Sequence, residues 1–162
     1  MTITFILNGE DVETNADANQ RLIDIIRDDF KLAGAKSGCL CGNCGSCTVI
    51  FNGSIVSACL IPAMRVRGSE IITIEGYELT DEYTDIIKGF NEANVRSCGY
   101  CNSAKILITE TLLTQTLEPA QTDIITAFSG IKCRCTDLES LINGVIAAAI
   151  IRKRRKNNAG NI

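Results

Sequence analysis

A cluster of cysteines and glycines occupies residues 38–48, which read GCLCGNCGSCT. The three glycines disfavour a helix or a strand, so the four cysteines are expected on a loop. The whole chain has nine cysteines and no histidine. Without histidine there can be no Ser-His-Asp or Cys-His catalysis, no Cys/His zinc finger, no Rieske centre and no histidine-bound haem. The composition therefore predicts an all-thiolate metal site.

The first cysteine group has the spacing of a plant-type ferredoxin. Cys39, Cys44 and Cys47 follow the pattern C-x4-C-x2-C, and Cys59 comes after a predicted hairpin. Three thiolates from one loop must wrap a 2Fe–2S cluster, and loop amides pointing inward can bond its sulfides. Glycines permit the positive φ angles and close approach that this needs. The glycines in question are Gly38, Gly42 and Gly45. Zinc knuckles and the 4Fe–4S cysteine run fit this spacing less well.

Cys41 lies in the same loop but outside the ferredoxin spacing. It can be an alternative ligand, a reactive thiol or a small residue that the loop tolerates. We favour the last interpretation, because a free cysteine behaves as a small hydrophobe unless its surroundings activate it.

A second cysteine group follows further along the chain. Cys98 and Cys101 form a C-x2-C pair, and Cys133 and Cys135 form a C-x-C pair. Alone, these pairs fit a zinc site, a redox pair or an iron–sulfur site. Each pair lies directly before a predicted helix, and two helix N-termini suit an anionic thiolate cluster. Both iron–sulfur and zinc remain open from the residues alone, with iron–sulfur favoured.

The first half of the chain predicts a small mixed sheet packed on one helix. Alternating apolar residues indicate strands at residues 2–7, 11–14, 48–51, 54–57 and 70–75. Asn8-Gly9 and Asn52-Gly53 indicate tight hairpin turns. Apolar spacing over residues 20–30 predicts the helix. Its apolar face is expected to hold Leu22, Ile25, Ile26 and Phe30.

Beyond Gly76 the patterns are mainly helical. We expect helices at residues 81–93, 103–116, 122–129 and 136–151. The last is the clearest, because Thr136 and Glu139 match a capping box and an apolar stripe follows. The stripe, expected to be bundle core, comprises Leu138, Leu141, Ile142, Val145 and Ala149. The predicted fold is therefore α+β, with one domain at 1–76 and a second at 77–162.

Composition and charge indicate where in the cell such a chain functions. Hydrophobic residues make up 46% and charged residues 22%, with a net charge of -3, so the chain should fold. The apolar run at 145–151 is too short to cross a bilayer, and the N-terminus does not read as a secretory signal. We expect a cytoplasmic protein with reduced thiols and without membrane insertion.

A basic run, residues 152–156, carries five positive charges. Without this run the chain has 11 basic and 19 acidic residues, which gives a net charge of -8. Such a run can bind nucleic acid or an acidic partner. We favour a solvated helix end instead and expect no nucleic acid, because no stacking aromatic residues accompany the charges.

The cysteine motifs taken together resemble a known family. GCLCGNCGSCTV, Cys59, CGYC and CRCT, in this order, are similar to the small iron–sulfur subunit of the molybdenum hydroxylases, such as xanthine and nicotinate dehydrogenase. The resemblance covers nearly the whole chain. It implies an N-terminal β-grasp, ferredoxin-like domain and an all-α four-helix bundle, each holding one 2Fe–2S cluster. The implied ligands are Cys39, Cys44, Cys47 and Cys59 for the first, and Cys98, Cys101, Cys133 and Cys135 for the second.

The resemblance also implies a role. A large subunit of such enzymes holds molybdopterin and the substrate, and a medium subunit holds FAD. The small subunit passes electrons from molybdenum through the bundle cluster and then the ferredoxin-type cluster to the flavin. On this basis the chain is an electron-transfer subunit of an oxidoreductase and has no catalytic residue of its own.

The sequence departs from the family pattern around the second cysteine group. Ser97 stands where the family usually has glutamine, Asn102-Ser103-Ala104 where it has Thr-Pro-Gly, and Asp137-Leu138 where it has Gly-Tyr. We expect both clusters to be retained and the contact with the molybdenum cofactor to be altered. The alternatives are a free-standing ferredoxin-like or redox-sensing module with another partner, and a structural zinc protein.

Overall fold

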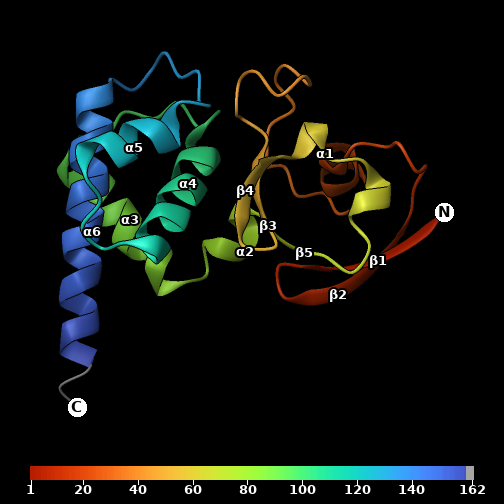
Figure 1. The fold of residues 1–162 in the computed structure, drawn as a ribbon, viewed down its shortest axis with the longest axis horizontal. Helices are drawn as coiled ribbons and strands as arrows, with labels where there is room; N and C mark the ends of the chain where they lie inside the picture. Colours follow the sequence, from red (N-terminus) through yellow and green to blue (C-terminus); the bar gives the residue numbers. More distant parts are fainter. Residues whose placement is uncertain (160–162) are drawn as a thin grey trace.

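A mixed β-sheet and a bundle of helices lie side by side in the computed structural model, which describes residues 1–159 (Figure 1). The sheet comes from the N-terminal half of the chain and the bundle from the C-terminal half, so the predicted α+β class is confirmed. The last three residues of the predicted second domain lie outside the described residues.

The sheet has five strands in the order β2-β1-β5-β3-β4. Their bounds are β1 Thr2–Leu7, β2 Glu10–Asn15, β3 Thr48–Phe51, β4 Ser54–Ser57 and β5 Glu70–Ile72. β1 and β5 run parallel, while the other neighbours are antiparallel. All four residues of the two Asn-Gly turns have positive φ, as tight hairpins require. This mixed sheet with its helical cover is the predicted β-grasp arrangement.

The helix predicted at residues 20–30 forms in an unusual geometry. A short α1, Leu22–Asp24, continues as a π-helical turn η1, Ile25–Asp29. The amide of Phe30 bonds the oxygen of Ile25, five residues earlier, as a π-helix requires. Together the two segments bury Leu22, Ile23, Ile25 and Ile26 completely in the core of the N-terminal half. Two short 3-10 turns, η2 Ala58–Leu60 and η3 Ala63–Arg65, follow the second hairpin.

The last predicted strand, residues 70–75, is too long by three residues. The chain leaves the sheet after Ile72 and forms the short helix α2, Ile74–Tyr77. The reason is Thr73, whose amide donates to Asn8 Oδ1 at 2.8 Å instead of to a neighbouring strand. Its hydroxyl then bonds Glu75 Oε2 at 2.7 Å, which turns the backbone toward the bundle.

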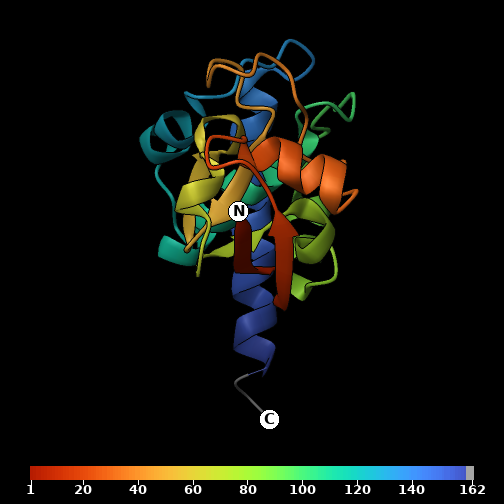
Figure 2. The ribbon, with the colours of Figure 1, turned by 90° about the vertical axis from the view of Figure 1, so that its right-hand side faces the viewer.

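The bundle contains the four helices that the sequence predicts. Their bounds are α3 Asp81–Glu92, α4 Asn102–Gln115, α5 Gln121–Phe128 and α6 Leu138–Ala159. Their apolar faces form one core, distinct from the core beneath the sheet. Helix α4 lies against β3 and β4 and joins the two halves. Figure 2 shows α6 extending beyond the rest of the molecule at its C-terminal end.

The start of α6 differs from the predicted capping box. Asp137 caps the helix, since its Oδ1 accepts from the amide of Ser140 at 2.7 Å. Thr136 instead directs its hydroxyl to the backbone oxygen of Arg96. Leu138, expected in the buried stripe, is 50% exposed, and Ala148 takes a place in the core. The capping residue therefore lies one position later than predicted.

The basic run continues α6, but two of its residues are not solvated as expected. Arg152 is 1% exposed, its Nη2 lies 2.7 Å from Glu110 Oε2, and it donates to the oxygen of Glu82 at 2.9 Å. Arg155 donates to both carboxylate oxygens of Asp85, at 2.9 and 3.2 Å. The prediction was wrong here because the acidic partners come from α3 and α4, far earlier in the chain.

The rest of the basic run faces solvent. Arg154 and Lys156 are exposed, and Lys153 pairs with the exposed Glu118. Among residues 1–159, no helix combines the length and apolar character that a membrane crossing needs.

Helices α3 and α6 pack closely at Gly89. A Cβ atom there would lie 2.3 Å from the backbone nitrogen of Ala148 and 2.6 Å from its Cα. Gly89→Ala is expected to destabilise the protein by at least about 2 kcal/mol, because two backbones must move apart. Thermal unfolding should show a midpoint lower by roughly 4–8 °C. Lys88→Ala, at the exposed neighbouring position, is the control. Equal midpoints for the two variants would contradict the close packing.

Candidate metal centre

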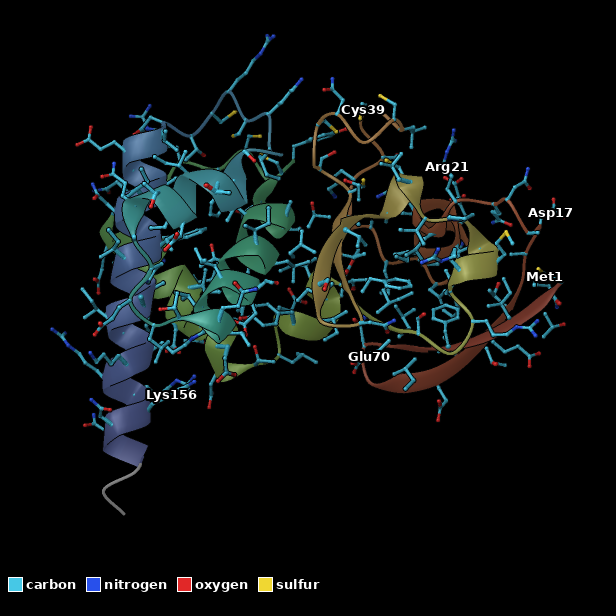
Figure 3. The ribbon with its side chains drawn as sticks, viewed as in Figure 1. Met1, Asp17, Arg21, Cys39, Glu70 and Lys156 are labelled. Carbon is cyan, nitrogen blue, oxygen red and sulfur yellow. The ribbon has the colours of Figure 1, made fainter. Side chains whose placement is uncertain are left out.

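Both cysteine groups lie at the same end of the molecule. Figures 1 and 2 show the loop before β3 and the loop before α6 beside each other at this end. Figure 3 places Cys39 here, and Lys156 near the opposite end of α6. A cavity of about 260 Å³ lies between the loops. It is lined by Cys44, Ser46, Cys98, Tyr100, Cys101, Lys132, Cys133, Arg134 and Cys135. All nine cysteines of the chain are free thiols.

The first cysteine loop directs backbone amides at a sulfur. The amides of Asn43 and Cys44 donate to Cys39 Sγ at 3.1 and 3.3 Å. Hydrogen bonds from backbone amides, first that of Cys41 and then those of Cys44 and Asn43, lower the pKa of Cys39 to about 6. The loop thus stabilises a thiolate, and the same turn geometry can serve an anionic cluster.

The expected glycine conformations are present in two of three cases. Gly42 and Gly45 have φ angles of +74° and +72°. Gly38 has no positive φ, but a Cβ there would lie 2.8 Å from Cys44 Sγ. Gly38 is therefore required only because Cys44 Sγ lies too close to leave room for a side chain.

The thiols of the first group lie in pairs. Cys39 contacts Cys44 through its side chain, and Cys47 contacts Cys59. The second pair lies deep beneath the sheet, with exposures of 2% and 4%. Burial, with a smaller contribution from the Cys59 side chain, raises the pKa of Cys47 to about 11. Cys59 lies in η2, directly after the second hairpin. The sequence predicted this position of Cys59 just past the hairpin.

Cys41 is exposed beside the first pair. Its thiol bonds that of Cys39, and this contact, followed by desolvation, raises the pKa of Cys41. The structure therefore brings Cys41 to the outer rim of the site. Its thiol contacts Cys39, but Cys41 is exposed and lies outside the ferredoxin spacing.

The thiols of the second group also lie in two pairs, and each pair joins one cysteine of the C-x2-C motif to one of the C-x-C motif. The thiol of Cys98 contacts Cys135, and that of Cys101 contacts Cys133. Burial raises the pKa of Cys101 to about 11. Burial acts the same way on Cys133, but the backbone amide of Cys135 and other hydrogen bonds outweigh it and lower the pKa to about 7. Both cysteine motifs lie just before helices, α4 and α6, as expected.

The paired arrangement fits a dinuclear centre. Within residues 1–159, no three histidine, cysteine, aspartate or glutamate side chains converge on a single-ion site. A tetrahedral zinc site needs four ligands around one point. A 2Fe–2S cluster instead takes two thiolates on each of two irons, which matches two pairs per group. The donor set, the inward amides and the cavity all suit such a cluster.

The two cysteine groups are joined directly. The amide of Lys132, just before Cys133, donates to the oxygen of Cys44 at 3.2 Å, and its ammonium bonds Asn43 Oδ1. A Cβ at Gly45 would lie 2.5 Å from the oxygen of Gly130. Only glycine permits this approach, so Gly45 keeps the two loops in contact.

One residue of the site was missed by sequence reasoning. Lys105, on α4, is fully buried behind the second group. Its Nζ donates to Thr136 Oγ1 at 2.7 Å, next to Cys135. The available signal was a lone lysine four residues after Cys101 within an apolar helical stretch. Residues four apart share a helix face, and a lysine on a buried face needs a nearby acceptor or anion.

The positions that depart from the family pattern lie at the edge of this site. Ser97 is exposed, and its Oγ accepts from the amide of Gly99 at 3.3 Å. Asn102 and Ser103 form the first turn of α4. Asp137 caps α6. Ser97 and Asp137 thus have local structural roles, and the altered cofactor contact stays a prediction.

Comparisons with known proteins agree with this geometry. Residues 5–71 match the 2Fe-2S iron-sulfur cluster binding domain, and residues 73–146 match the 2Fe-2S binding domain. The nicotinate dehydrogenase small FeS subunit of Eubacterium barkeri is 41% identical, over 84% of this chain and 87% of that protein. A probable xanthine dehydrogenase subunit of Bacillus subtilis is 34% identical, over 95% of this chain and 86% of that protein.

Solved structures show the same fold. A chain of quinoline 2-oxidoreductase from Pseudomonas putida 86 is 28% identical, with a TM-score of 0.87 over 95% of this chain and 96% of that one. The aldehyde oxidoreductase of Desulfovibrio desulfuricans is 31% identical, with a TM-score of 0.84 over 94% of this chain and 17% of that one.

Fold and site together define an electron-transfer protein with two 2Fe–2S binding domains. The chain belongs to the family of small iron–sulfur subunits of the molybdenum hydroxylases.

Proposed function

We propose that eight cysteines hold the two clusters, one in each domain. Cys39, Cys44, Cys47 and Cys59 serve the first, and Cys98, Cys101, Cys133 and Cys135 serve the second. The observation that carries this is that each set of four converges. The amide of Cys44 bonds Cys39 Sγ and Cys47 and Cys59 share one core, while the four cysteines of the second set line one cavity. The domains are taken as residues 1–76 and 77–162. One apolar core lies within the first, and the core of the helices also takes in Ile50 and Ile74 from the first.

The protein's contribution is to hold the clusters and set their potentials. Amides directed at Cys39 stabilise thiolate charge, and burial of Cys47 and Cys59 removes water from one side of the first cluster. When bound, the clusters supply one-electron transfer. No residue of this chain needs to touch an organic substrate.

The partners proposed for this chain are a large molybdopterin subunit and a medium FAD subunit. Electrons then pass from molybdenum through the second cluster and the first cluster to the flavin. Two observations support an assembly of several different chains. Relatives of similar length are named as small or gamma subunits of dehydrogenases, and the aldehyde oxidoreductase chain is far longer than this one. Free thiols throughout the described chain suit the cytoplasm as its location.

Anaerobic affinity purification from the native host tests this function. About four irons and about four inorganic sulfides per chain are expected, in a red-brown sample that bleaches with dithionite. Larger chains that carry molybdenum and flavin should co-purify. A lone iron-containing monomer would favour the free-standing ferredoxin alternative, and a colourless sample containing zinc would overturn the assignment. About two irons would mean that one cysteine group has another role.

A further inference from the structure

Lys105 is a buried cation without an acidic partner. Its side chain is 0% exposed, and among residues 1–159 no carboxylate forms a salt bridge with it. Its Nζ donates to Thr136 Oγ1 at 2.7 Å and lies 3.5 Å from the backbone oxygen of Arg96. A buried ammonium is costly unless something nearby compensates its charge. Two neutral oxygens compensate it only in part.

The second cysteine group surrounds the same end of Lys105. Lys105 lies one helical turn after Cys101, on the same face of α4, and its ammonium reaches the residue that follows Cys135. The ammonium therefore lies beside both cysteine motifs, and thiolates held there would supply the negative charge that compensates it.

Other cations near this site face solvent. Lys132 and Arg134 line the cavity between the cysteine loops but are exposed. Water and salt screen exposed charges strongly, whereas a buried charge acts through a medium of lower effective dielectric. Lys105 therefore exerts the stronger influence on the second cysteine group.

Reduction of a 2Fe–2S cluster by one electron adds one negative charge to it. A fixed positive charge nearby stabilises the reduced form more than the oxidised form, and so raises the reduction potential. We propose that the buried ammonium of Lys105 tunes the second cluster in this way, favouring the arrival of electrons there. The inference rests on the proposed function, because it requires a cluster held by the second cysteine group.

Two uncharged variants separate charge from hydrogen bonding. Lys105→Met keeps the length and apolar stem of the side chain, while Lys105→Gln also keeps a donor for Thr136. In the purified complex, a redox titration followed by electron paramagnetic resonance should show a lower potential for one cluster in both variants. The expected loss is at least tenfold in the reduction equilibrium, or about 59 mV for a one-electron couple. The other cluster should keep its potential.

Arg134→Gln is the matched control, because it removes an exposed positive charge from the cavity that the second cysteine group lines. It should shift the potential much less than either Lys105 variant. Wild-type potentials in Lys105→Met or Lys105→Gln, with both clusters present, would overturn the proposal. Loss of the cluster in both of these and in Lys105→Arg would show a purely structural role. Absence of a second signal in the wild-type protein would instead contradict the proposed function.

Discussion

Cys59→Ser is expected to remove one of the two electron paramagnetic resonance signals of the reduced protein, together with about half of its iron and sulfide. Cys59 forms the buried thiol pair with Cys47, and a serine hydroxyl is a poor ligand for an iron–sulfur cluster. The second signal should persist, because none of the four cysteines of the other group belongs to the core that holds Cys47 and Cys59. Iron analysis and spectroscopy of the anaerobic protein measure both effects.

Cys41→Ser provides the matched control for this experiment. Cys41 lies in the same loop and contacts Cys39, but it is exposed and outside both thiol pairs. We expect both signals and all of the iron to remain. Loss of a signal here would make Cys41 a ligand. Loss of both signals in Cys59→Ser, with circular dichroism unchanged, would contradict two separate clusters.

Arg152→Ala is expected to lower the free energy of unfolding by about 3–5 kcal/mol. The guanidinium is 1% exposed and pairs with Glu110, while its Nε lies 3.5 Å from Asp85 and makes no hydrogen bond within residues 1–159. Truncation leaves a cavity and removes the partner of Glu110, so packing and charge balance are lost together. The midpoint of thermal unfolding should fall by roughly 10 °C.

Arg154→Ala tests whether burial is the cause. Arg154 belongs to the same basic run and the same helix but is exposed. Its replacement should leave the unfolding midpoint unchanged within error. Equal falls for the two variants would mean that net charge, and not the buried ion pair, stabilises the bundle.

The local features of the fold were predictable because their causes lie within a few residues. The Asn-Gly turns, the four bundle helices and the cysteine loops depend on residues that are close together in the sequence, and the structure contains each of them. The end of β5 was not predictable in this way. It depends on the bond from the amide of Thr73 to Asn8, which only the assembled sheet brings together.

The same distinction holds within the site and the basic run. The pattern alone identified all eight proposed ligands, since cysteine is rare and its spacing is informative. It did not show which lysine or arginine is inside the protein. Arg152 and Lys105 are buried where Glu110 on α4 and Thr136 in the loop before α6 bind them. Long cationic side chains are usually exposed, so the residue type alone predicts exposure, which is wrong for both Arg152 and Lys105.

The hydrogen bond from Lys132 to Cys44 has a kinetic consequence. Electron hopping slows steeply as two centres separate, and a hinge between the halves would make throughput depend on how often they met. Here Lys132 bonds both Cys44 and Asn43 across the two loops, so the clusters proposed for them would keep a fixed spacing. In an enzyme that contains this chain, the rate of electron transfer between the two clusters should then not depend on solvent viscosity.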